Sequence, residues 1–232
     1  MSLSYHLHPR AATHGAVGLL ALAEDISIEH DLRHWLEDST DLYTNRVACD
    51  AEISADTLAA MGQHLDNAVS LLPPGSPIDV VAYACTSGTM VLGVEAITQA
   101  VHRVHPNAQI STPLTAARRW LASQNANRLH VIAPYEPTLT QRVADAISNE
   151  LCPLGSVLTF DCRHDPTVMR IDQQSFESAF ASLTLQSGDA VFFACTALRT
   201  APWLDALQAA NPTVTISSSN HALAVEIKQF LQ

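Results

Sequence analysis

The segment DVVAYACTSGT (residues 79–89) returns as DAVFFACTALR (residues 189–199), nearly half the chain later. Each segment begins with Asp, continues through a short apolar run and closes on Ala-Cys-Thr. Short, continuous apolar runs are typical of strands that are buried on both faces. The repeat therefore predicts two equivalent buried strands, one ending at Cys85 and the other at Cys195.

Apolar strand-like runs alternate with helix-like segments on both sides of these two motifs. In the first half, strands are expected at 16–22, 79–84 and 108–112, and helices at 54–72, 89–102 and 113–124. In the second half, strands are expected at 129–135, 155–160, 189–194 and 213–217, and helices at 136–151, 172–185, 200–210 and 220–232. This alternation predicts parallel sheets that are covered by helices on both faces.

The expected fold class is therefore α/β, with two similar parallel-sheet lobes related by a pseudo-twofold axis. Residues 1–127 would form the lobe that contains Cys85, and residues 128–232 the lobe that contains Cys195. The helix that closes the first lobe could pack on the other one. Ligands bind at the carboxyl ends of the strands in open parallel sheets, so the active site is expected between the lobes.

Composition limits the partners of the chain. With 47% hydrophobic and 15% charged residues, the 232-residue chain is expected to be globular rather than disordered. The formal charge of −11 argues against binding to nucleic acid or to an anionic membrane surface, because a basic stripe is needed to neutralise phosphates. No run approaches the ~18 apolar residues of a membrane span.

The expected location is the cytoplasm, where thiols stay reduced. Five cysteines are an odd number, and no secretory pattern accompanies them. Arg10 and His14 precede GAVGLLALA (residues 15–23), which imitates a signal peptide. The apolar run is short and EDISIEHD follows it at once, which favours a strand that leads into a loop and a helix.

A thiol at the carboxyl end of a strand lies where ligands bind. Thr86 and Ser87 follow one cysteine, and Thr196 and Ala197 follow the other. These residues are expected to begin helices, whose free N–H groups and hydroxyls would hold a carboxylate or phosphate. The same position is expected to lower the cysteine pKa. A single cysteine there is most often a core residue, but a matched pair in two repeats indicates function.

The chain resembles the aspartate/glutamate racemase superfamily, in the branch of maleate cis–trans isomerases, arylmalonate decarboxylases and ectoine-utilisation proteins. The resemblance covers nearly the whole chain and rests on the combination of its motifs rather than on any one. They are GLLALAEDISIEHDLR (18–33), DVVAYACTSGTMVLG (79–93), VIAPYEPTLTQRV (131–143), TVMRID (167–172), FFACTALRT (192–200) and SSSNHAL (217–223). The Cys-Thr-Ser-Gly form is most similar to the ectoine-utilisation group.

This resemblance implies cofactor-independent chemistry at an activated carbon beside a carboxylate. It makes Cys85 and Cys195 the reactive pair of a racemase or cis–trans isomerase. It also implies a homo-oligomer, since the family often forms dimers or higher assemblies. The residues implied to bind the substrate are Thr86, Ser87, Thr196 and the neighbouring amide of Ala197, with Tyr135 donating a hydrogen bond.

Two departures from the maleate isomerases bear on the substrate. Those enzymes carry Asn in the first-strand loop and before the Val-x-Arg-Ile segment, where this chain has Asp25 and Asp165. An ionised Asp only accepts hydrogen bonds and repels a carboxylate, so it would rather meet an ammonium group. The change weakens maleate as a substrate and favours an amino acid, including an ectoine-derived diamino acid. Arylmalonate decarboxylases have only the second cysteine, so the pair argues against decarboxylation.

Two mechanisms remain open for the pair. In racemisation, one thiolate removes the α-proton and the opposite thiol returns a proton to the other face. In cis–trans isomerisation, Cys85 adds to the alkene carbon, the central bond rotates, and elimination follows. The sequence does not separate these two routes.

Other classes of function fit fewer features. A cysteine hydrolase needs a His base, and no His is tied to either cysteine by a motif. A two-lobed carboxylate-binding protein fits the architecture but gives no reason for paired thiols. His102 and His105 lack a third metal ligand, and TSGTMVLG lacks the Gly-Lys ending of a phosphate loop. Neither a metal nor any other cofactor is therefore expected.

Overall fold

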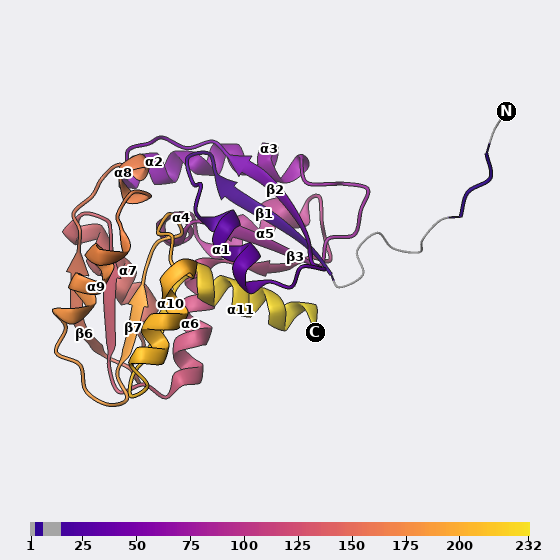
Figure 1. Cartoon of the computed structure of the whole chain (residues 1–232). Coiled ribbons are helices and arrows are strands. Elements are labelled where there is room, and N and C mark those ends of the chain that lie inside the picture. Colours follow the sequence, from indigo (N-terminus) through magenta and orange to yellow (C-terminus); the bar gives the residue numbers. More distant parts are fainter. Residues whose placement is uncertain (1–2, 7–14) are drawn as a thin grey trace.

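The computed structural model describes residues 3–6 and 15–232 and contains two parallel four-stranded sheets (Figure 1). In the first sheet the strand order is β2-β1-β3-β4, and in the second it is β6-β5-β7-β8, so the two sheets share one topology. The strands are β1 (Ala16–Leu22), β2 (Asp41–Val47), β3 (Val80–Ala84), β4 (Gln109–Ser111), β5 (Leu129–Ala133), β6 (Leu154–Thr159), β7 (Ala190–Phe193) and β8 (Thr215–Ser218). The predicted two-lobed α/β class is confirmed.

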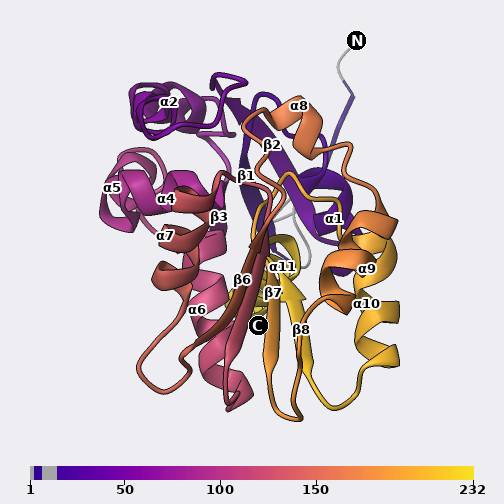
Figure 2. The ribbon, with the colours of Figure 1, turned by 90° about the vertical axis from the view of Figure 1, so that its left-hand side faces the viewer.

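Helices cover both sides of the strands. Figure 2 shows α4, α5, α6 and α7 on one side and α1, α9 and α10 on the other. The helices of the first half are α1 (Ile28–Trp35), α2 (Ala55–Ala60), α3 (Leu65–Ser70), α4 (Thr86–Leu92), α5 (Val94–His102) and α6 (Pro113–Gln124), with a 3₁₀ turn at Met61–His64. Those of the second half are α7 (Pro137–Ile147), α8 (Asp165–Val168), α9 (Gln173–Ala181), α10 (Ala201–Ala210) and α11 (Ser219–Leu231).

Three local expectations were wrong, each for a physical reason. Strand β2 was missed because it lies at a sheet edge, where its half-exposed residues need no continuous apolar run. The helix expected at 54–72 is interrupted by the 3₁₀ turn that contains Gly62, a residue that weakens helix interiors. The helix expected at 89–102 begins earlier, at Thr86, and breaks at Gly93, whose φ of +81° leaves the right-handed helical region.

The closing helix of each half packs against the other half. Trp120 of α6 lies 5.4 Å, centroid to centroid, from Phe192 of β7 in the second sheet. Three buried residues of α11 join the core of the first sheet, where they pack in one cluster with Val17 and Val80: Leu223, Ala224 and Ile227. In Figure 1, α11 accordingly runs beneath the first sheet. This exchange of helices ties the two lobes together, with the predicted boundary at 127/128 falling between α6 and β5.

Two expectations about the amino-terminal region have different outcomes. Residues 16–22 form the buried strand β1, as the sequence indicated. Arg10 and His14, the basic residues before this strand, lie outside the described residues. Within the described part of the chain, no helix combines the length and apolar character that a membrane crossing requires.

Candidate active site

Cys85 and Cys195 lie at the carboxyl ends of the central strands β3 and β7, where the repeat predicted them. Each thiol is free, and each residue is only 5% exposed. Both line one small pocket between the lobes, whose volume of about 20 Å³ is roughly the space of one water molecule. The pocket is lined by Leu22, Asp25, Ile53, Leu58, Cys85, Ser87, Tyr135, Asp165, Cys195, Thr196 and Ala197.

Nearly all the candidate residues named from sequence thus meet at one place. Thr86 is the exception, because its buried hydroxyl lies 2.8 Å from the Ser219 hydroxyl of α11 and not in the pocket lining. The sequence could not show this, since Ser219 lies more than a hundred residues away. In this structure the Thr86 hydroxyl contacts the closing helix, and its expected role in binding the substrate stays a prediction.

The backbone fixes Cys85 at the start of α4. Cys85 is in an extended conformation, and its Sγ accepts a hydrogen bond of 3.2 Å from the N–H of Gly88, as a helix cap does. The Ser87 hydroxyl lies 3.8 Å from the same sulfur. Helix α4 thus begins directly after Cys85, and the N–H of Gly88 in its first turn hydrogen-bonds the thiol.

The segment after Cys195 differs from that after Cys85. No helix begins at Thr196 or Ala197: the chain makes a turn, and α10 begins only at Ala201. Hydrogen bonds to the first lobe hold this turn, including one of 2.8 Å from the Ser27 hydroxyl to the carbonyl of Ala197. The predicted helix dipole at Cys195 is thus wrong, although the backbone N–H of Ala197 still acts to lower the pKa of the Cys195 thiol.

Tyr135 and Ser87 bring hydroxyl groups to the pocket that contains both thiols. Burial raises the pKa of the Tyr135 hydroxyl well above its ordinary value, and its interactions with Cys195 and Ser87 change this pKa in opposite directions. Ser87 in turn lies beside Cys85. Both sulfurs and these two hydroxyl-bearing residues therefore line the same small volume.

Burial, rather than the helix start, controls the cysteine pKa values. Desolvation raises the pKa of Cys85 to about 12, and the charge of Asp165 adds to the effect. The Gly88 N–H and the Ser87 hydroxyl act in the opposite direction but are weaker. Burial likewise raises the pKa of Cys195 well above its ordinary value. The expectation of lowered cysteine pKa values is therefore wrong for the pocket as it stands, because a thiolate there is poorly solvated.

Asp25 contributes a carboxylate whose two oxygens differ. Its Oδ1 accepts hydrogen bonds of 2.7 Å from the N–H of Ser27 and 3.0 Å from that of Ile28, at the start of α1. Its Oδ2 is buried and receives no hydrogen bond from the described residues. The neighbouring Thr196 hydroxyl donates instead to the carbonyl of Ala84, at 3.1 Å. Burial raises the pKa of Asp25, and the amide hydrogen bonds, the nearby Thr196 hydroxyl and the charge of Arg46 only partly oppose this effect.

Asp165 brings a second carboxyl group to the pocket. Its pKa is raised to about 7, first by burial and then by the charges of Asp25 and Glu24. None of the described residues that line the pocket is Lys, Arg or His. Arg46 is the cation whose charge acts on Asp25, but its guanidinium binds Glu29 and the backbone carbonyl of Asp25. The pocket therefore combines two carboxyl groups with two thiols and has no positive side chain in its described lining.

Sequence reasoning missed several residues that shape the site. Ile53 and Leu58 supply apolar lining, and Asp31 is a fully buried acid on the apolar face of α1. That face could have been found from the sequence, because Ile28, Asp31 and Leu32 are spaced to lie together on a helix. A buried acid among apolar neighbours indicates a polar partner from another element.

Other features of the described residues lie away from the thiols. A larger hollow of about 490 Å³ between α6, α10 and α11 contains no cysteine. His102 hydrogen-bonds the carbonyl of Ala108 at 3.1 Å, while His105 is buried. Across residues 3–6 and 15–232, no group of three or more His, Cys, Asp or Glu side chains is arranged to hold a metal ion.

Comparison with solved structures identifies the fold, whereas no protein-family model and no curated protein matches the sequence. A Cys-to-Ala variant of the maleate isomerase Iso from Pseudomonas putida, with maleate, is 19% identical with a TM-score of 0.81, over 92% of this chain and 90% of its own. The fold is that of the maleate isomerases. A second solved structure is a Cys-to-Ser variant of the Nocardia farcinica maleate cis–trans isomerase with a covalently bound succinylcysteine intermediate. It is 19% identical, with a TM-score of 0.82, over 94% of this chain and 92% of its own.

The arylmalonate decarboxylases share this architecture less closely. A double variant in its liganded form is 17% identical, with a TM-score of 0.69 over 92% of both chains. At these identities the likeness establishes the maleate isomerase fold and nothing finer. This fold agrees with the one that the resemblance of the sequence motifs implied.

Proposed function

We propose that this protein is a cofactor-independent isomerase of a small carboxylate, in which Cys85 and Cys195 act on one carbon from opposite sides. One observation carries the proposal: two buried thiols, each at the end of an equivalent central strand, line the same pocket between the lobes. A core role explains one buried cysteine but gives no reason for a matched pair at one cavity. The maleate isomerase fold supports the same class of reaction.

The acidic lining favours a substrate that carries an amine as well as a carboxylate. The unpartnered Oδ2 of Asp25 and the carboxyl group of Asp165 both border the pocket. A buried carboxylate oxygen without a donor is costly, and an ammonium group would supply both the hydrogen bond and the opposite charge. An amino acid fits these groups better than a dicarboxylate such as maleate, and a diamino acid of the kind derived from ectoine fits them equally well.

The same ammonium group would help to activate the thiols. Desolvation and neighbouring carboxylates raise the pKa of both cysteines, so little thiolate forms in the absence of positive charge. A cationic substrate brings that charge into a desolvated pocket, where it favours the ionised form. Binding and activation are then coupled, and the thiolate forms when the amine is present.

Racemisation follows directly from this arrangement. One thiolate takes the α-proton of the substrate, and the C–H electron pair moves toward the carboxylate to give an enolate-like charge. In this proposal the N–H of Ala197 and the hydroxyls of Ser87 and Tyr135, residues that line the pocket, stabilise that charge as it develops. The opposite thiol then returns a proton to the other face and becomes a thiolate. One proton is lost and one is gained, so no cofactor is required.

Cis–trans isomerisation is the second candidate, favoured by one comparison. The Nocardia farcinica maleate cis–trans isomerase carries a succinylcysteine intermediate, which indicates covalent addition of a cysteine in that enzyme. In this chain, the Cys85 thiolate would add to an alkene carbon, the central bond would rotate, and elimination would release the thiolate again. The acidic pocket lining argues against maleate itself as the substrate, because carboxylates repel one another.

A proton NMR experiment in D₂O tests the proposal. Wild-type protein is incubated with single enantiomers of α-amino acids and diamino acids, and with maleate and an arylmalonate. The expected result is loss of the α-proton signal together with inversion for an amino acid, and loss of turnover in both Cys85→Ser and Cys195→Ser. The matched control is Cys152→Ser, a buried cysteine outside the pocket lining, which keeps wild-type turnover.

Each contrary outcome points to a different function. Conversion of maleate to its trans isomer would favour covalent addition, and release of CO₂ from the arylmalonate would favour decarboxylation. Binding that saturates without proton exchange would indicate a carboxylate-binding protein. A separate assay with a panel of esters and amides tests for a cysteine hydrolase. Hydrolysis that survives Cys195→Ser but not Cys85→Ser would indicate that class of enzyme and would refute the paired-thiol proposal.

A further inference from the structure

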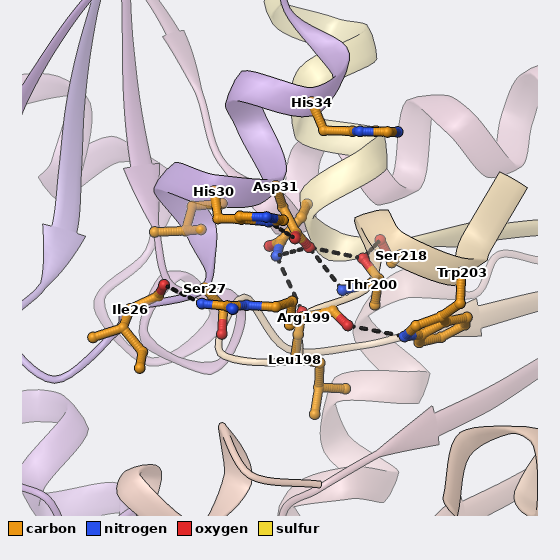
Figure 3. A network of polar contacts seen from close by, with 12 residues as sticks. Ile26, Ser27, His30, Asp31, His34, Leu198, Arg199, Thr200, Trp203 and Ser218 are labelled. Atoms are coloured by element: carbon orange, nitrogen blue, oxygen red, sulfur yellow. Dashed lines mark hydrogen bonds and ion pairs between the residues drawn. The ribbon is translucent and has the colours of Figure 1, made fainter. Parts of the chain in front are cut away.

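A buried polar cluster surrounds the carboxylate of Asp31 (Figure 3). Its Oδ2 accepts three hydrogen bonds: 2.8 Å from the N–H of Thr200, 3.0 Å from the Thr200 hydroxyl and 2.9 Å from Nδ2 of Asn220. Oδ1 lies 3.3 Å from the ring of His30. Asp31, Thr200 and Asn220 are each completely buried. We call Asp31, Thr200, Ser218 and Asn220 the Asp31 cluster.

The Asp31 cluster holds the segment that carries Cys195. Asn220 Nδ2 also lies within hydrogen-bond distance of the carbonyls of Thr196, at 2.9 Å, and Leu198, at 3.2 Å. Thr200, at the other end of this turn, is bound by the Asp31 carboxylate and lies 2.8 Å from the Ser218 hydroxyl. The contacts of this turn with Asp31 and Asn220 therefore lead, directly or through Asn220, to one carboxylate on α1 of the other lobe.

The same cluster reaches the segment that carries Cys85. The Thr196 hydroxyl donates to the carbonyl of Ala84, the residue before Cys85, at 3.1 Å. Thr86, the residue after Cys85, pairs with Ser219, which stands between the cluster residues Ser218 and Asn220. The SSSN run at residues 217–220, which the proposed chemistry leaves without a role, thus contacts the chain on both sides of the pocket.

The turn that follows Cys195 has no regular secondary structure that would fix its conformation. Residues 195–200 form neither helix nor strand, so their conformation depends on contacts with other elements. Hydrogen bonds to a charged acceptor in a buried site are stronger than those between neutral groups, and each has a defined direction. A carboxylate that accepts three of them fixes the turn more firmly than solvated loop contacts could.

We propose that Asp31 is a positioning residue that fixes Cys195 opposite Cys85 by anchoring the turn at residues 196–200 to the first lobe. Asp31 does not line the pocket and touches neither sulfur, so it acts through the turn. The inference rests on the proposed function for its effect on turnover, but its geometric content is independent of any substrate. Replacing the carboxylate by an amide should release the Cys195 segment and leave the cap at Cys85 in place.

The test is the rate at which each cysteine of the full-length protein is alkylated by iodoacetamide under folding conditions, measured peptide by peptide by mass spectrometry. In Asp31→Asn, the Cys195 rate is expected to rise about tenfold, because hydrogen bonds to a charged acceptor are worth at least that factor. Thr200→Val, which keeps the carboxylate and removes one donor, is expected to raise the rate severalfold. This milder variant decides the question if Asp31→Asn fails to fold.

Asp189→Asn is the matched control, because Asp189 is also a buried carboxylate that accepts several hydrogen bonds, but at the amino end of β7. Its melting temperature should fall while the Cys195 rate stays within about twofold of wild type. An equal Cys195 rate in Asp31→Asn and Asp189→Asn, with no increase in Thr200→Val, would overturn the proposal. Labelling needs no substrate, so this failure is distinct from a lack of isomerase activity.

Discussion

Gly88 is the position in the site where one added carbon has the clearest consequence. A Cβ at this residue would lie 2.7 Å from the Tyr83 hydroxyl oxygen and 2.8 Å from both the Cys85 sulfur and the Met61 methyl carbon. The methionine end is flexible and can move, whereas the tyrosine is completely buried. The cysteine sulfur is therefore the group that must give way, and with it the hydrogen bond from the Gly88 N–H.

The magnitude follows from two opposing effects. Overpacking a buried site costs about 1–3 kcal/mol, while replacing Gly by Ala inside a helix gains about 1 kcal/mol. With three contacts below 3.0 Å, the upper part of the overpacking range applies, so Gly88→Ala should lose roughly 2 kcal/mol of unfolding free energy. In a chain of 232 residues, this corresponds to a fall in melting temperature of about 4–8 °C.

The assay is thermal unfolding followed by circular dichroism, combined with the alkylation rate of Cys85. Gly75→Ala is the matched control, because a Cβ there meets nothing within 4 Å. That variant should melt within about 2 °C of wild type, with a small gain from its stiffer unfolded chain. A Gly88→Ala protein that melts at or above the wild-type temperature, with an unchanged Cys85 rate, would refute the packing described around this thiol.

Two further predictions concern buried carboxyl groups and pH. The pKa of Asp165 is about 7 in the folded protein and near 3.8 when unfolded, so this group costs stability progressively as pH rises from 4 to 7. Asp165→Asn should therefore melt higher than wild type by a margin that grows over this range; a margin independent of pH would contradict it. Burial raises the pKa of Glu226, and its ion pair with Arg119 opposes this effect. Arg119→Ala should therefore lose ~1 kcal/mol of unfolding free energy at pH 8, or about 2–4 °C in melting temperature, and less at pH 5, where more of the Glu226 carboxyl group is protonated. Melting curves at both pH values would show this difference.

The repeated Cys motif made the fold predictable. Continuous apolar runs identified β3 and β7, because buried parallel strands leave little choice of residue. Strand β2 escaped the same reasoning, since an edge strand with half-exposed residues has no such signature. Breaks at Gly62 and Gly93 depend on local geometry that helical spacing does not encode.

Most residues that line the pocket could be predicted from the sequence, but the directions of their pKa shifts could not. Strand ends and motif resemblance named eight of the residues that line the pocket, because the carboxyl ends of parallel strands share one edge within each sheet. The pKa of Cys85 depends on how completely the lobes close over it, which no local pattern records. The contact of Thr86 with Ser219 and the role of Asp31 likewise depend on α11 crossing to the first lobe.

The most direct test of the central claim is exchange of the substrate α-proton with solvent deuterium, measured for each enantiomer in the Cys85→Ser and Cys195→Ser variants. If the sulfurs face opposite sides of one α-carbon, Cys85→Ser should exchange the α-proton of one enantiomer only, and Cys195→Ser that of the other, with neither variant inverting the substrate. Exchange of the same enantiomer by both variants, or continued racemisation by either one, would show that the two thiols do not share the reaction.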